Sequence, residues 1–200
     1  MNTILKFACI GLCLMLFTSA EAENAYTLGL RVGNGQLESK SSKKGGGGGR
    51  SGTQTKTVKA SKTWPVSVSC RGKERPAKLT LNVFYIGTRN GSPLVMKKET
   101  IDVDLDEKGD FKRDLESPTA ELVKVTTRTQ SGGGRGGHHG GNHGGGSVST
   151  KTKTTGDRVT GCIVQLMDGS TVAKSFASNP SWAKLAKTDP LPEEEVLKFR

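Results

Sequence analysis

Apolar and polar positions are patterned most clearly between residues 158 and 177, in the run RVTGCIVQLMDGSTVAKSFA. Two apolar-rich segments flank Asp168-Gly169, a pair that suits a two-residue type I′ turn because both of its residues need φ > 0. The pattern therefore predicts a β-hairpin. Its cross-strand pairs are expected to be Val164–Ala173, Cys162–Ser175 and Gly161–Phe176, with the phenyl ring covering the strand glycine.

The first strand of this hairpin is apolar on both faces. One face is predicted to carry Cys162, Val164 and Leu166, and the other Val159, Ile163 and Met167. A strand that is apolar on both faces is typical of the centre of a sheet rather than of its edge. We therefore expect the inner hairpin of a β-sandwich.

Shorter stretches in which apolar and polar residues alternate surround this hairpin. They predict strands over 64–70, 79–85, 101–105, 111–115, 122–129 and 148–155, with turn signals between them. Asn179-Pro180 is expected to begin a short helix, since Asn suits the N-cap and Pro the first helical position. The predicted fold class is all-β: a single antiparallel β-sandwich of immunoglobulin-like architecture, with a short C-terminal helix and disordered Gly-rich arms.

The composition changes along the chain and predicts four segments, the third of which contains a long loop. Residues 1–22 have the charged start, short apolar core and small-x-small end of a secretory signal peptide. Residues 23–63 are predicted to be a flexible, basic, Gly-rich arm, in which the alternation at 26–32 fits either a strand or a loosely attached segment. Residues 64–188 form the sandwich domain, interrupted by a disordered Gly/His-rich loop at 131–147, and residues 189–200 form a C-terminal tail. We expect a secreted protein, periplasmic or extracellular, with no membrane span after signal cleavage.

The net charge of +11 is concentrated in the arms. Residues 23–63 contain eight basic and two acidic residues, whereas residues 156–200 contain six of each. The arm lysines and arginines (Lys40, Lys43, Lys44, Arg50, Lys56, Lys59 and Lys62) fit either a polyanion-binding segment or a linker kept soluble by charge.

The predicted mature chain has two cysteines, Cys70 and Cys162, each in phase with apolar neighbours. An even number of cysteines in an exported protein permits a disulfide, here of the inter-sheet kind found in immunoglobulin folds. The alternative is two buried free thiols that pack as small hydrophobic groups.

Three histidines, His138, His139 and His143, lie together in the Gly/His-rich loop. Imidazoles at this spacing are candidate ligands for zinc, copper or nickel, while the alternative is an incidental feature of a low-complexity loop. The remaining candidate chemistry is the row of Asp102, Asp104 and Asp106 on one strand face, which is more typical of a solvated edge than of acid–base catalysis.

No catalytic motif and no nucleotide-type glycine motif is present in the sequence. We therefore expect no enzyme activity and no cofactor. The leading hypothesis is an exported, non-enzymatic β-sandwich that acts as a structural or interaction module at the cell envelope or outside the cell, with an envelope protein or an anionic polysaccharide as its partner. The alternative is a polyanion- or metal-binding secreted protein that uses the basic arm and the Gly/His loop.

Overall fold

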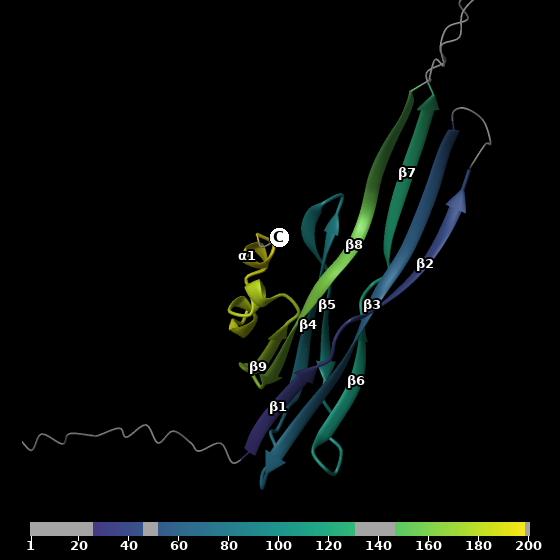
Figure 1. The fold of residues 1–200 in the computed structure, drawn as a ribbon. Helices are drawn as coiled ribbons and strands as arrows, with labels where there is room; N and C mark the ends of the chain where they lie inside the picture. Colours follow the sequence, from purple (N-terminus) through teal and green to yellow (C-terminus); the bar gives the residue numbers. More distant parts are fainter. Residues whose placement is uncertain (1–25, 46–51, 131–146, 199–200) are drawn as a thin grey trace, which may run out of the picture.

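The computed structural model describes residues 26–45, 52–130 and 147–198 and is predominantly β (Figure 1). Nine strands pair antiparallel in one continuous network. They are β1 (Tyr26–Val32), β2 (Gln36–Lys44), β3 (Gly52–Gly72), β4 (Leu79–Arg89), β5 (Ser92–Asp102), β6 (Asp110–Glu116), β7 (Ala120–Gln130), β8 (Val148–Asp168) and β9 (Thr171–Ala177). Within the described ranges, helix is confined to two 3₁₀ turns, Pro180–Trp182 and Leu185–Lys187, and to α1 (Glu193–Val196).

Two long strands, β3 and β8, run through the whole molecule and change neighbours on the way. The first half of β3 pairs with β2 and β7, and its second half pairs with β1 and β6. The first half of β8 pairs with β7, and its second half pairs with β4 and β9. The result is an elongated molecule with two parts, which Figure 1 shows one above the other. We call the lower part the body and the upper part, residues 36–44, 52–63, 120–130 and 148–156, the finger.

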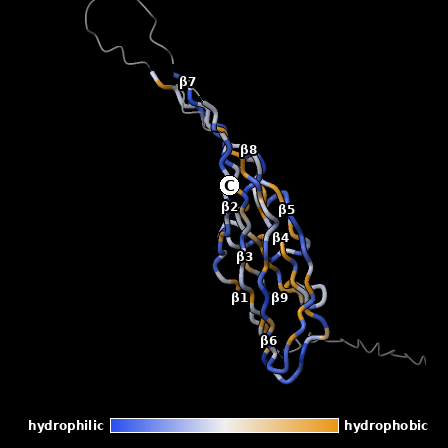
Figure 2. The backbone as a smooth tube through the Cα atoms, turned by 90° about the vertical axis from the view of Figure 1, so that its right-hand side faces the viewer, coloured by the Kyte–Doolittle hydropathy of each residue, from blue (hydrophilic) through white to orange (hydrophobic). Residues whose placement is uncertain are grey.

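The body holds the hydrophobic core. Alternate residues of β3 point into it, and they meet alternate residues of β4 and β8. The buried set includes Trp64, Val66, Val68 and Cys70 of β3, Leu81, Val83 and Tyr85 of β4, and Cys162, Val164 and Leu166 of β8. The apolar positions are concentrated accordingly in the body (Figure 2). The period-2 pattern therefore identified the inward faces of these strands correctly.

The opposite face of β8 is also buried, as expected for a central strand. Ile163 packs there against Trp182 and Val196 of the C-terminal segment, and the Gln165 side-chain amide donates hydrogen bonds to the carbonyls of Ala186 and Thr188. The segment predicted as a tail is thus fastened to the body. The expected helix start at Asn179 is confirmed, since its side chain accepts a hydrogen bond from the Ser181 N–H.

The 158–177 hairpin is present, but its predicted register is wrong. The outermost pair is Asp168–Thr171, so the turn residues are Gly169 and Ser170, and a bulge follows between Leu166 and Met167. Val164 consequently lies opposite Phe176 rather than Ala173. The neighbours of Gly161 are Ser178 and the Trp182 ring rather than Phe176.

A second irregularity moves Val159 to the core. The register between β4 and β8 shifts after Ile86, so that Gly87 pairs with Val159 and Thr160 is the extra residue. A bulge reverses the phase of alternation. Val159 therefore packs in the same core as Cys162, not on the face predicted for it.

The arm predicted to be flexible over 23–63 instead contains β1, β2 and the first half of β3. The strand alternative for 26–32 is confirmed by its pairing with β3. The linker interpretation of 36–62 overlooked the β-branched Thr and Val residues, which favour strands even where neither face is apolar. The predicted signal peptide at 1–22 and nearly all of the Gly/His-rich loop lie outside the described residues.

Gly156 marks the place where β8 leaves β7 for β4. Its φ is +112°, and a Cβ atom there would lie only 2.1 Å from the Glu121 carbonyl oxygen. Both the backbone angle and the close approach therefore require glycine.

We expect Gly156→Ala to lower the free energy of unfolding by about 2 kcal/mol or more, because it adds a steric clash to an unfavourable backbone angle. Gly91→Ala is the matched control, since Gly91 also has a positive φ, of +88°, but has no atom within 4 Å of the added Cβ. The control is expected to cost about 1 kcal/mol. Urea denaturation measures both values, and equal losses would contradict the role assigned to the close approach.

Candidate functional site

The finger combines a small apolar content with a strongly basic charge. Its four strand segments contain ten basic residues and two acidic ones, Glu38 and Glu121. The basic residues are Lys40, Lys43, Lys44, Lys56, Lys59, Lys62, Lys124, Arg128, Lys151 and Lys153. Every residue of β2 is exposed. The finger is therefore the strongest charged surface in the part of the chain that the structure describes.

Strand register sorts these charges onto two faces, because directly paired residues lie on the same face and neighbours in sequence lie on opposite faces. We call the face that continues the inward face of β3 the core-side face. It carries five basic residues and no acidic one: Lys43, Lys56, Lys62, Lys124 and Arg128. The opposite face carries the other five basic residues together with both glutamates, and Lys59 forms an ion pair with Glu121 there at 3.4 Å.

Three lysines of the core-side face lie in a single row across the sheet. Lys56 of β3 pairs directly with Lys43 of β2 on one side and with Lys124 of β7 on the other. Neighbouring strands are about 4.8 Å apart, so the three ammonium groups repel one another. Among the described residues, none of the three has a carboxylate within ion-pair distance. We call these residues the lysine row.

The lysine row is suited to binding anions. An ammonium group donates up to three hydrogen bonds, and an anion that bridges two or three of them also removes their mutual repulsion. The sequence identified Lys43 and Lys56 as members of a basic arm but did not connect them with Lys124, which lies far along the chain. That connection depends on strand register, which no local pattern records.

The two cysteines both lie in the core, but they are not bridged: each is a free, buried thiol. Tyr26, which is paired with Gly72, donates a hydrogen bond of 2.5 Å to Asp168, so the end of β8 lies beside the Cys70 end of β3. Cys162 precedes Asp168 by six strand residues, which span about 20 Å. A disulfide needs Cα atoms about 4.4–6.8 Å apart. Both cysteines do lie on the inward faces predicted for them. They are separated because they lie at different levels along the direction of the strands.

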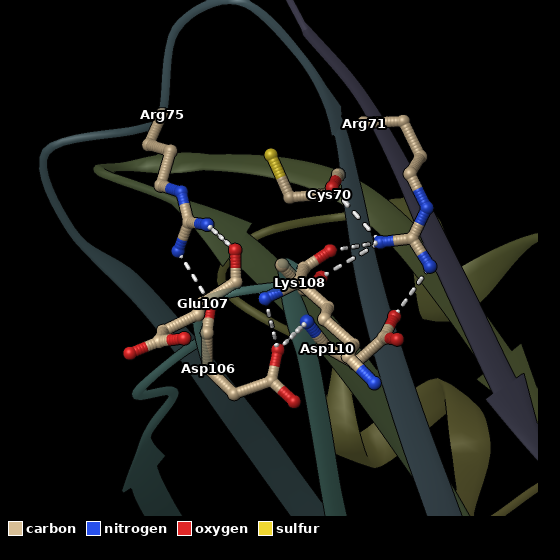
Figure 3. Close-up of polar contacts among 8 residues, drawn as sticks. Cys70, Arg71, Arg75, Asp106, Glu107, Lys108 and Asp110 are labelled. Atoms are coloured by element: carbon tan, nitrogen blue, oxygen red, sulfur yellow. Dashed lines mark hydrogen bonds and ion pairs between the residues drawn. The ribbon is translucent and has the colours of Figure 1, made fainter.

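The expected row of aspartates does not stay on one strand, because β5 ends at Asp102. Asp102, Asp104 and Asp106 are exposed, and the Asp106 carboxylate accepts hydrogen bonds from the backbone N–H groups of Lys108 and Asp110 (Figure 3). Both hydrogen bonds lower the pKa of the Asp106 carboxyl group, and the bond from Asp110 has the larger effect. The carboxylate is therefore part of a turn and is unsuited to holding a proton near neutral pH.

Two arginines also hold this turn in place. Arg71 donates to the carbonyls of Lys108 and Gly109 and forms an ion pair with Asp110 at 2.6 Å. Arg75 donates to the carbonyls of Asp106 and Glu107, each at 2.6 Å (Figure 3). The oxygen atoms of this acidic turn are thus used to bind guanidinium groups.

The candidate metal ligands His138, His139 and His143 lie outside the described residues. Within the ranges that the structure does describe, no group of three His, Cys, Asp or Glu side chains is placed to hold a metal ion. None of the helices found there has the length and apolar character needed to span a membrane.

Comparison of the chain with protein-family models, with curated proteins and with solved structures finds no match.

Thiol titration tests the arrangement of the cysteines. In protein produced without residues 1–22, unfolded in the absence of reductant, we expect two reactive thiols per chain. The folded protein is expected to react slowly, because both thiols are buried. Zero thiols in the unfolded, unreduced chain would contradict the strand register described above.

Alkaline pH tests the environment of Cys162. Burial raises the pKa of this thiol to about 12, although the nearby Lys62 ammonium group opposes the shift. The folded protein therefore keeps a proton that the unfolded chain loses near pH 9. The resulting stabilisation is complete below that pH and is lost as the pH rises toward 12, with a slope of up to about 1.4 kcal/mol per pH unit.

We expect urea denaturation between pH 8 and 11 to show this slope in the wild type and a shallower one in Cys162→Ala. Tyr85 contributes in the same direction at higher pH in both proteins, since burial and then Glu99 raise its pKa. The difference between the two curves isolates the thiol. Parallel curves over the whole range would rule out the buried thiol as a source of alkaline instability.

Proposed function

We propose that this protein is an exported, non-enzymatic interaction module that binds an anionic polymer, such as an acidic polysaccharide, along the core-side face of its finger. The observation that supports this most directly is the lysine row, in which three like charges lie side by side with no acidic residue on that face. Such a row destabilises the free sheet, and an anionic ligand removes the cost.

The length of the charged face favours a polymer over a small anion. The face extends from Lys62 to the level of Gly52, whose direct partner is Arg128. Ten residues of strand span about 33 Å. Charges spread over that distance fit a chain of repeating acidic groups, and they act together through the release of bound counterions.

We further propose that the body is an immunoglobulin-like sandwich. This interpretation is supported by the strand order, with β3 between β1 and β6 in one set and β9, β8, β4 and β5 in sequence in the facing set. In immunoglobulin terms these are strands A, B, E and strands G, F, C, C′. The finger is then an extension of the two central strands B and F.

The exported location and the absence of enzyme activity remain parts of this proposal. The pattern of residues 1–22 supports export to the periplasm or the exterior. Two groups of the body that could do acid–base or nucleophilic chemistry are engaged elsewhere, since the Asp106 carboxylate holds a turn and the Cys162 thiol is buried. A binding role fits what the exposed lysines offer.

Heparin and dextran sulfate serve as probes of the polymer site, with neutral dextran as the uncharged control. We expect the triple variant Lys43→Gln, Lys56→Gln, Lys124→Gln to bind at least 10-fold more weakly than the wild type and with a smaller dependence on salt. The matched control replaces three charges on the opposite face, Lys40→Gln, Lys151→Gln and Lys153→Gln. Its affinity for the two probes is expected to fall less than 3-fold, because the replaced charges lie away from the bound polymer.

Two further results would decide against the proposal. Equal losses in the two triple variants would mean that net charge, not the lysine row, governs binding, and no binding of the wild type at low salt would remove the function itself. Lys56→Gln alone is expected to raise the melting temperature at low ionic strength while weakening binding, since it relieves cross-strand repulsion. A loss of binding caused by misfolding would lower the melting temperature instead.

A further inference from the structure

A separate feature of the core-side face is an apolar groove at the base of the finger. Its volume is about 270 Å³. Its floor is formed by Val58 and Ala60 of β3 and Leu122 of β7, and its sides include Leu37 of β2 and Val159 of β8. It lies where β8 leaves β7, directly after Gly156. The first residues of β8 after this point, 157–159, line the groove, and Val58 and Ala60 continue the inward face of β3 there.

The groove exposes apolar surface in an otherwise polar part of the molecule. Leu37 is 60% exposed, the highest value among the large hydrophobic residues that the structure describes. No side chain of the described chain fills the groove. An apolar ligand would therefore gain free energy by covering this surface.

Two basic residues, Lys62 and Arg158, also line the groove. Within the described part of the chain, no carboxylate lies within ion-pair distance of either one. The only acidic residue of the groove, Asp157, is already engaged by the Arg89 guanidinium group through two hydrogen bonds of 2.9 Å. The Lys62 ammonium group donates a hydrogen bond of 3.4 Å to the Thr160 carbonyl. The groove thus combines an apolar floor with two positive charges that no carboxylate of the described residues pairs.

We propose that this groove binds the alkyl chain of an anionic lipid-like amphiphile, with the phosphate or carboxylate of the ligand held by Lys62 and Arg158. An alkyl chain matches the apolar floor, and the charge of the ligand is the complement of the charge that the groove presents. This site lies below the lysine row and uses none of its three lysines, although Lys62 belongs both to the groove and to the core-side face. It goes beyond the proposed polymer binding, and either proposal can fail without the other.

Alkyl phosphates below their critical micelle concentration are suitable probes in calorimetric titrations of the whole chain. From octyl to decyl to dodecyl phosphate, we expect the affinity to rise by up to about fourfold for each added methylene until the groove is full. Inorganic phosphate, which has no alkyl chain, is expected to bind at least 100-fold more weakly than dodecyl phosphate by the same reasoning. Dodecyl maltoside, which has no charge, is expected to bind at least 10-fold more weakly.

Two kinds of variant separate the apolar and charged parts of the site. Ala60→Phe fills the groove and is expected to reduce dodecyl phosphate binding at least 10-fold. Ser61→Phe introduces the same ring on the opposite face of the same strand and is the matched control. The double variant Lys62→Gln, Arg158→Gln keeps the groove open, and its affinity for dodecyl phosphate is expected to fall to that of dodecyl maltoside.

The outcomes that would overturn the proposal are distinct. Equal effects of Ala60→Phe and Ser61→Phe, or equal affinities for dodecyl phosphate and dodecyl maltoside in the wild type, would exclude this ligand class. Sedimentation of a dimer that Leu37→Asp dissociates, together with no amphiphile binding, would assign the groove to a second copy of the chain. An unchanged far-ultraviolet circular dichroism spectrum and an unchanged melting temperature of Ala60→Phe would show that this variant is folded.

Discussion

The structure depends on one strand, β8, being shared between two sets of neighbours. Its first half completes the finger beside β7, and its second half lies in the body between β4 and β9. A strand can change partners in this way only if its backbone turns without leaving unpaired polar groups, and Gly156 at φ +112° meets this need. The Gly156 N–H donates to the Asn90 side chain, and the Asn90 N–H donates to the Gly156 carbonyl. The backbone N–H and carbonyl groups of Gly156 are therefore both hydrogen-bonded at the point where β8 bends.

This arrangement explains how the finger can exist with almost no core of its own. A small polar sheet is only marginally stable in water, but β3 and β8 continue without interruption into the buried centre of the body, which holds them in place. The same property lets the finger carry charges that an isolated sheet would tolerate poorly. Lysines on its two edge strands, β2 and β8, also discourage pairing with other chains. Charge thus limits aggregation while the body supplies the stability.

The sequence allowed the body to be predicted well and the finger hardly at all. Strand phases in the body could be predicted because one residue in two is apolar, as at Val66, Val68 and Val83, and burial keeps that pattern intact. In the finger, Thr and Lys alternate with other polar residues, so no face is marked as inward and the β-branched content was the remaining signal.

A separate difficulty is to predict which residues of different strands lie at the same level. Periodicity assigned Cys70 and Cys162 to inward faces, yet it contains no information on which residues lie at the same level. The lysine row has the same origin, because it joins Lys43, Lys56 and Lys124 through pairings that only the assembled sheet defines.

The two proposed binding sites follow from the same geometric event. In the finger, β8 lies beside β7 in the same sheet, and it crosses to β4 only after Gly156. The side chains of the finger that continue the inward face of β3 therefore lie outside the hydrophobic core, as at Val58 and Leu122. Near the body they are still apolar, as at Val58, Ala60 and Leu122, because they continue the inward pattern of β3. One row farther out they are Lys43, Lys56 and Lys124. Both acidic residues of the finger lie on the other face, where Glu121 pairs with Lys59. The apolar positions of the groove and the lysine row therefore lie on the same face, one row of residues apart, and each offers a different chemistry to a ligand.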